Sequence, residues 1–154
     1  MSLKIIKIPA DILKRKIKEV SPTELASPDF QSLIEQMRTT MVSAKGIGLA
    51  ANQIDRDVQV FVIDQKLAKE HGVPDVFINP EITEYSPDED ELEEGCLSIP
   101  NYYVQMRRSK KIKIKALDAG GKKIKFKARG FLARVLQHET DHLNGTVIKD
   151  RVSG

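Results

Sequence analysis

Two short stretches of strict alternation constrain the fold of this chain more than any other feature. Ile112 and Ile114 alternate with lysines in the stretch KKIKIK, and Ile124 and Phe126 alternate with lysines in KKIKFK. A period of two gives each stretch one apolar and one cationic face, as in a half-buried strand, and the linking LDAGG supplies a turn. The pattern therefore predicts an antiparallel β-hairpin.

The lysine face of this hairpin has two interpretations. Rows of lysines bind nucleic acid in some proteins, and on the edge of a sheet they prevent aggregation in others. No aromatic residue stands among these outward positions to stack on a base, which favours a solvated face. The formal net charge is only +3, so the overall charge gives no argument for nucleic acid, and no contact with DNA is expected.

A helix is expected after Ser27. Ser27 can cap the helix, Pro28 suits its first position, and Asp29 interacts favourably with the positive end of its dipole. Apolar residues then recur at helical spacing and form one stripe: Phe30, Leu33, Ile34, Met37 and Met41. Gly46 follows as a stop.

The remaining segments place strands before a C-terminal helix. VQVFVID (58–64) and VFINPEI (76–82, interrupted by Pro80) read as strands, and the acidic YSPDEDELEEG (85–95) as a solvated loop. From Gly130 the apolar spacing becomes helical and ends at Asn144-Gly145. This order predicts an α+β fold in which antiparallel or mixed sheets pack around the C-terminal helix, in one domain over residues 1–154.

That last helix carries a metal-binding pattern. In LQHETDHLNG, His138 and His142 are four residues apart, so both imidazoles project from one face of a helix and can share a metal ion. A third ligand is needed. The protease patterns fail, because Ile148 stands where a third histidine would follow, and no glutamate comes after His142. Asp150 is the only carboxylate left, and no helix is expected to support it.

The third ligand must therefore come from upstream, where EEGCLSIP offers Cys96. It is the only cysteine, so it forms no intrachain disulfide, and a thiolate is a good ligand for zinc and similar divalent metals. A small buried hydrophobic role is the ordinary alternative for a free cysteine. Beside an incomplete two-histidine site, we favour the ligand role.

A third stretch, KGIGLAANQI (45–54), has little side chain on a strand-like backbone. Gly46 and Gly48 allow another chain to approach closely, and Gln53 offers an amide that both donates and accepts hydrogen bonds. A phosphate-binding loop is excluded, because no strand precedes the stretch and no Gly-Lys-Ser/Thr follows it.

In this order, GIGLAANQ, EGCLS and QHETDHLNG resemble the three motifs of the peptide deformylase family. The resemblance implies that Cys96, His138 and His142 bind the metal and that Glu139 is the catalytic acid/base. It also implies that Gln53 and the backbone N–H of Leu97 hold the developing oxyanion, and that Gly46, Ile47 and Gly48 lie along the substrate. Several positions depart from the commonest pattern, among them Asn52, where proline is frequent, and Asn101, where glycine is usual.

The implied reaction is hydrolysis of the N-formyl group of N-formylmethionyl nascent peptides, giving formate and a free α-amine. The implied cofactor is one divalent ion, Fe²⁺ natively, with Zn²⁺, Ni²⁺ or Co²⁺ able to occupy the site. An apolar pocket beside the metal would take the methionine side chain, and Leu136, half a turn before His138, is a candidate wall. Two alternatives stay open: a metalloprotease of unfamiliar ligation, and a metal-binding or ribosome-associated module without turnover.

The remaining expectations concern location and partners. The N-terminal stretch has no apolar run of a secretory signal, and no segment approaches 18 apolar residues, so we expect no membrane contact. A cytoplasmic location, or an organelle that translates with formylmethionine, follows from the implied substrate. The lysine hairpin together with Arg107-Arg108 could attract ribosomal RNA weakly.

Overall fold

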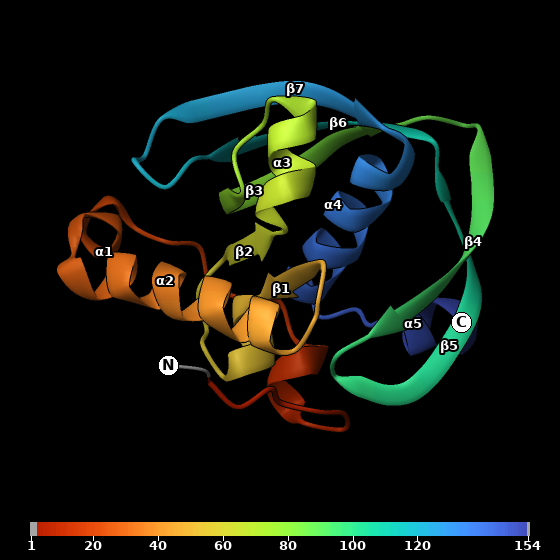
Figure 1. Cartoon of the computed structure of the whole chain (residues 1–154), viewed down its shortest axis with the longest axis horizontal. Coiled ribbons are helices and arrows are strands. Elements are labelled where there is room, and N and C mark those ends of the chain that lie inside the picture. Colours follow the sequence, from red (N-terminus) through yellow and green to blue (C-terminus); the bar gives the residue numbers. More distant parts are fainter. Residues whose placement is uncertain (1–2, 154) are drawn as a thin grey trace.

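The computed structural model describes residues 3–153 and builds them around a five-stranded antiparallel sheet (Figure 1). The strand order is β1-β2-β3-β6-β7, and a separate two-stranded ribbon joins β4 to β5. The strands are β1 (Gly48–Ala50), β2 (Val60–Ile63), β3 (Val76–Tyr85), β4 (Glu89–Cys96), β5 (Ile99–Ser109), β6 (Lys111–Leu117) and β7 (Lys123–Arg129). The α+β architecture with a C-terminal helix is therefore confirmed.

The helices are α1 (Pro22–Ala26), α2 (Pro28–Ser43), α3 (Gln65–His71), α4 (Gly130–Leu143) and α5 (Ile148–Ser153), with 3₁₀ turns η1 (Asp11–Lys14) and η2 (Ala51–Ile54). The expected start of α2 is confirmed, because the Ser27 side chain accepts from the backbone N–H of Asp29 and Pro28 occupies the first turn. The end of α4 is confirmed as well, with Asn144 as its C-cap and Gly145 at φ 80°. Within the described residues, none of the helices has the length and apolar character needed to cross a bilayer.

The sheet has an apolar core on each face. Val60 and Val62 of β2 face the buried stripe of α2, whereas Phe61 and Ile63 pack in the core that contains α4. Phe61 stacks on its cross-strand partner Phe77, with ring centroids 4.9 Å apart. Because β2 is covered on both faces, all four of its residues are apolar and buried, and the sheet holds α4 in a fixed position.

The predicted hairpin of residues 111–127 is confirmed as β6 and β7. The strand expected around VFINPEI is longer than predicted, since β3 runs through Pro80 to Tyr85. The register shifts between Ile78 and Glu81, so Pro80 stands at an irregularity where its missing N–H costs no ladder hydrogen bond. Asn79, at φ 51°, anchors this point through hydrogen bonds to the backbone of Val20.

Two expectations about local structure were wrong. The acidic stretch is not a solvated loop: residues 89–96 form β4, which pairs along its length with β5 and sets Glu91 opposite Arg107 and Asp90 opposite Arg108. Charge composition alone does not predict this strand, because the cations that balance its acidic residues come from another strand, β5. In addition, Asp150 does lie on a short helix, α5, where its carboxylate accepts from the backbone N–H of Val147.

Candidate metal centre

Helix α4 and the end of β4 bring three metal-ligating side chains together. Cys96 Sγ lies 3.3 Å from His142 Nε2, and one ligand atom from each of Cys96, His138 and His142 lies within 4.8 Å of the others. The two imidazole centroids are 5.0 Å apart, as expected for residues one helical turn apart. The thiol and the two imidazoles, predicted from segments 42 residues apart in the chain, thus converge on one point.

The protonation of His142 suits metal binding. Burial lowers the pKa of His142 well below its ordinary value, so its imidazole is neutral and has a free lone pair. One thiolate and two imidazoles leave a fourth position of a tetrahedral divalent ion open. The donor set therefore fits a catalytic site for zinc, iron or a similar metal better than a closed structural one.

A buried carboxylate orients His138. The Nδ1 N–H of His138 donates to Glu94 Oε1 at 3.0 Å, which leaves Nε2 as its ligand atom. Burial alone would raise the pKa of the Glu94 carboxyl, but hydrogen bonds from His138 and Arg108 outweigh burial and bring that pKa to about 2. Glu94 is therefore ionised at neutral pH and can only accept the hydrogen bond from His138.

Glu94 belongs to a buried charge network that the sequence analysis missed. Arg108 donates to both Glu94 oxygens at 2.7 and 3.0 Å and to Asp141 at 2.8 Å. Arg134 also donates to Glu94, and Arg151 of α5 donates to Asp141. One signal was available: a metal-binding histidine needs an acceptor for its second ring nitrogen, and Glu94 stands two residues before the proposed cysteine ligand.

This network corrects the expectation that Arg107 and Arg108 attract RNA together. Arg108 is only 3% exposed and bonded on both sides to carboxylates. Arg107 is exposed but lies 3.6 Å from Glu89 and 3.7 Å from Glu91. The pair is therefore neutralised within the β4–β5 ribbon, because carboxylates of β4 lie opposite both arginines.

Glu139 lies beside the ligands without joining them. It is 3% exposed, and burial raises the pKa of its carboxyl to about 7. Its Oε1 has no hydrogen-bond partner among the described residues. A Cβ placed on Gly48 would lie 2.6 Å from Oε2, so the bare backbone of β1 makes room for this carboxylate. A carboxyl group with a pKa near neutrality is suited to both accepting and donating a proton.

Gln53 reaches the centre from η2. Its amide oxygen accepts from the backbone N–H of Ala50 at 3.0 Å, which fixes the amide so that Nε2 faces Ser98 Oγ (3.1 Å) and Cys96 Sγ (3.8 Å). Neighbouring Asn52 is fully buried and donates to the backbone carbonyl of His142 at 2.7 Å, which ties η2 to the end of α4. The Asn52 side chain thus holds η2 against the end of α4, a contact that proline at this position could not make.

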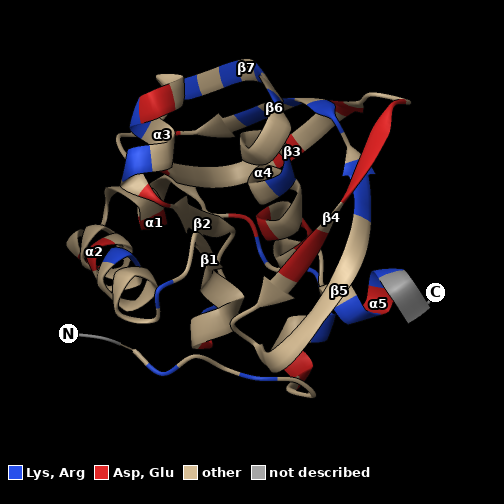
Figure 2. Cartoon of the chain, turned by 45° about the vertical axis from the view of Figure 1, so that its right-hand side comes forward, with Lys and Arg blue, Asp and Glu red and all other residues tan. Residues whose placement is uncertain are grey.

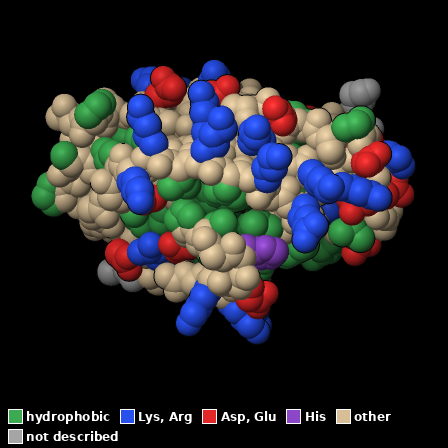
Figure 3. Space-filling model, turned by 90° about the horizontal axis from the view of Figure 1, so that it is seen from above, with side chains coloured by type: hydrophobic (Ala, Val, Ile, Leu, Met, Phe, Trp, Pro, Cys, Tyr) green, Lys and Arg blue, Asp and Glu red, His purple; other side chains and the backbone are tan. Residues whose placement is uncertain are grey.

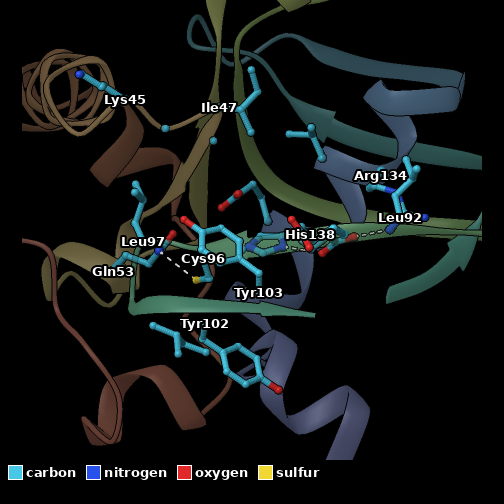
Figure 4. A pocket seen from close by; sticks show the side chains of 18 of the residues that line it. Lys45, Ile47, Gln53, Leu92, Cys96, Leu97, Tyr102, Tyr103, Arg134 and His138 are labelled. Atoms are coloured by element: carbon cyan, nitrogen blue, oxygen red, sulfur yellow. Dashed lines mark hydrogen bonds and ion pairs between the residues drawn. The ribbon is translucent and has the colours of Figure 1, made fainter. Parts of the chain in front are cut away.

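Cys96, His138, Glu139 and Gln53 open onto one cavity of about 570 Å³ (Figure 4). Its walls come from residues 45–48, from the β4–β5 turn around Cys96 and Leu97, and from α4. Six residues to which the family resemblance gives a role line it: His138, Glu139, Gln53, Gly46, Ile47 and Gly48. Asn101 lines it too, and its φ of 61° explains why a position that favours glycine tolerates asparagine.

The prediction that Leu136 forms a wall of the cavity was wrong. It is fully buried in the core with the sheet and does not line the cavity, whereas Val135 does. On a helix, Val135 is three residues before His138 and shares its face, while Leu136 is two residues before it and points away. The candidate apolar wall of the cavity is therefore Val135.

Comparison with known proteins gives one consistent result. The family model described as "Polypeptide deformylase" matches residues 2–154. Two similar relatives are the peptide deformylases of Prochlorococcus marinus strain MIT 9312 (42% identical, 99% of this chain and 74% of that protein) and Thermodesulfovibrio yellowstonii (42%, 98% and 89%).

Solved structures agree. An actinonin-bound class I type b peptide deformylase from Acinetobacter baumannii is 36% identical, with a TM-score of 0.89 over 98% of both chains. The peptide deformylase of Thermotoga maritima is 37% identical, with a TM-score of 0.88 over 97% of both chains.

Proposed function

Because this chain belongs to the polypeptide deformylase family, we propose that its Cys96, His138 and His142 hold the catalytic metal and that Glu139, Gln53 and Leu97 act on the substrate. The protein is a metal-dependent hydrolase that removes the N-formyl group from N-formylmethionyl nascent peptides, giving formate and a free α-amine. The observation that carries the assignment of residues is the convergence of the three ligand atoms within 4.8 Å of one another, where Cys96, His138 and Glu139 line one cavity.

When bound, a divalent metal lowers the pKa of a water molecule and polarises the formyl oxygen. Glu139 accepts the proton of the water that attacks the formyl carbon. It then gives that proton to the nitrogen of the breaking C–N bond, so the amine leaves neutral, and the formic acid that remains loses its proton to solvent to give formate. A carboxyl with a pKa of about 7 is matched to both transfers at neutral pH.

Negative charge develops on the formyl oxygen during this attack. The Nε2 amide of Gln53, already held by Ala50, and the backbone N–H of Leu97 are the proposed donors to it. Donors fixed before the reaction stabilise such charge without reorganising, and the loss of one typically costs about 10²–10³ in rate.

The substrate backbone would lie along residues 46–48. β1 is the end strand of the sheet, so its outer edge is available for an added strand. Selectivity would follow from size, because a formyl carbon carries only hydrogen and the buried end of the cavity at Glu139 and Gly48 has little room for more. Val135 would border the pocket for the methionine side chain.

The remaining details are proposals of the same kind. The chain acts as one catalytic domain. Fe²⁺ is the proposed native ion, with Zn²⁺, Ni²⁺ or Co²⁺ as substitutes. The substrate places the enzyme in the cytoplasm of a bacterial-type cell or in an organelle that translates with formylmethionine, with weak contact to the ribosome.

The test is release of formate from formyl-Met-Ala-Ser by protein loaded anaerobically with iron. Turnover that disappears in Glu139→Gln, while the metal stays bound, would support the assigned roles. Cleavage of internal bonds in blocked, unformylated peptides without release of formate would contradict them.

A further inference from the structure

Arg134 is a buried cation that the proposed reaction does not use. Figure 3 shows basic side chains that stand out from one face of the molecule into solvent, whereas Arg134 is only 4% exposed. It lines the cavity of the metal centre from α4, on the helix face that also carries Val135 and His138. A buried guanidinium is costly unless it is paired, so its partners indicate what it does.

The hydrogen-bond partners of Arg134 lie in the β4–β5 ribbon. Its Nη1 donates to Glu94 Oε2 and to the backbone carbonyl of Met106, the latter at 3.0 Å. Its Nη2 donates to the backbone carbonyl of Asp90 at 3.0 Å and to the Asp90 carboxylate at 2.8 Å. Asp90 and Glu94 belong to the acidic strand β4, which is largely red in Figure 2, and the ribbon is separate from the five-stranded sheet. Arg134 therefore ties β4, which ends at Cys96, to the helix that carries both histidines.

Glu94 joins Arg134 to His138. Its Oε2 accepts from Arg134, and its Oε1 accepts from His138 Nδ1 at 3.0 Å. Arg134 and His138 are four residues apart on α4, so one carboxylate spans two consecutive turns of the helix. Arg108 also binds both oxygens, but it comes from β5, the strand paired with β4, and it reaches α4 at Asp141, beyond His138. Arg134 therefore fixes Glu94 relative to the helix turn that precedes His138.

We infer that Arg134 is a positioning residue of the metal centre, which acts through Glu94 to set the orientation of the His138 imidazole. The inference rests on the proposed function, in which His138 is a metal ligand. A ligating imidazole is oriented by the acceptor on its other ring nitrogen, so whatever holds that acceptor also bears on the metal. Arg134 and His138 both line the cavity in Figure 4. The alternative is a purely structural tie between ribbon and helix, which would change stability and not metal binding.

The experiment measures the zinc affinity of the full chain by competition with a chelator, which needs no substrate. Arg134→Met keeps an unbranched stem along the cavity and removes the guanidinium. It should bind zinc about tenfold more weakly, at the lower end of the range for groups that support a ligand. The visible absorption of the cobalt-loaded protein should shift as well, because it reports the geometry of the ligands.

The matched control is Arg38→Met. Arg38 lies on α2, donates twice to Asp75 at 2.8 and 2.9 Å, and does not line the cavity of the metal centre. Because this site is separate from the metal ligands, zinc affinity should stay within about twofold of wild type.

A double-mutant cycle tests whether Arg134 acts through Glu94. In a Glu94→Gln background, Arg134→Met should cost less than about twofold in zinc affinity, because the carboxylate that Arg134 holds is absent. At saturating zinc, kcat for formyl-Met-Ala-Ser should fall about tenfold in Arg134→Met while KM stays within about twofold, since the stem that lines the cavity is kept. Arg134→Lys can still donate to Glu94 but cannot also hold Asp90, so its zinc affinity should be about threefold below wild type.

Three results would overturn the inference. Zinc affinity of Arg134→Met within about twofold of wild type, with a lower Tm, would make Arg134 a structural tie alone. Equal losses in the wild-type and Glu94→Gln backgrounds would show that it does not act through Glu94. An equal loss in Arg38→Met would show that reduced stability by itself weakens zinc binding.

Two further outcomes are separated by the design. If Arg134→Met does not fold, Arg134→Lys decides in the same two backgrounds: a loss of about threefold in wild type and none in Glu94→Gln supports the inference, and equal values contradict it. Zinc binding by the wild type without release of formate would refute the proposed function and leave the comparison of zinc affinities intact.

Discussion

Replacing Gly48 by alanine should disable the enzyme while leaving its metal in place. The added Cβ would lie 2.6 Å from Glu139 Oε2 and 2.9 Å from both Cδ and Cγ of that side chain. Favourable contacts between carbon atoms begin near about 3.5 Å, so the carboxylate must withdraw by roughly 1 Å. Neither group can move away easily. The backbone of Gly48 is paired with Ile63 in the sheet, and the Glu139 side chain is buried, with 3% exposed.

A displacement of about 1 Å in a catalytic group can cost about 10²-fold in rate. We therefore expect kcat for formyl-Met-Ala-Ser to fall about a hundredfold in Gly48→Ala. The amount of metal bound per protein should not change, because the alanine methyl contacts Glu139 and not Cys96, His138 or His142. Initial rates of formate release, metal analysis and thermal unfolding together test this expectation.

Gly72→Ala is the matched control. Gly72 ends α3 at φ 65° with nothing within 4 Å of an added Cβ, so alanine should cost roughly 1–2 kcal/mol of stability and no activity. If Gly48→Ala kept activity within about threefold of wild type, the position of Glu139 would not limit the reaction. If Gly48→Ala lost its metal, the conclusion that Glu139 is not a metal ligand would be wrong.

Further changes separate binding, chemistry and stability. Glu139→Gln should retain metal and lose about 10²–10⁴ in turnover, whereas Cys96→Ala should lose metal on dialysis; near wild-type turnover of Glu139→Gln would refute its role. Glu94→Ala leaves Arg108 and Arg134 buried without this partner and should lower the free energy of urea unfolding by about 3–5 kcal/mol; a change below about 1 kcal/mol would contradict the buried network. The same variant should bind zinc about 10–100-fold more weakly, as measured by competition with a chelator, because His138 loses its acceptor. Iron-loaded enzyme should lose activity in air faster than nickel-loaded enzyme, with oxidation of Cys96 visible by mass spectrometry, and equal lifetimes would count against iron-driven inactivation.

Local patterns sufficed for the elements that carry the ligands. The spacing of His138 and His142, the cap at Ser27 and the alternation of residues 111–127 each depend on neighbours along the chain, and each is confirmed. The pairing of Cys96 with the histidines was accessible because the chain has one thiol and an incomplete two-histidine site.

Composition misled where the deciding partner is distant in sequence. An acidic run reads as a solvated loop until β5 lies beside it with Arg107 and Arg108, and β3 continues through Pro80 only because its register shifts there. Leu136 was misplaced for a different reason. Its distance from His138 along the chain is short, but the rotation of a helix by two residues turns it to the opposite face, into the core.

The sequence by itself determined which residues can bind a metal, which helix carries them and which family they belong to, because ligand chemistry and helical period are properties of short segments. Only the tertiary structure decided that Glu94 orients His138 and that Gly48 makes room for Glu139. These two contacts join residues that are 44 and 91 positions apart in the chain, and they exist only once the sheet is paired and α4 is packed on it.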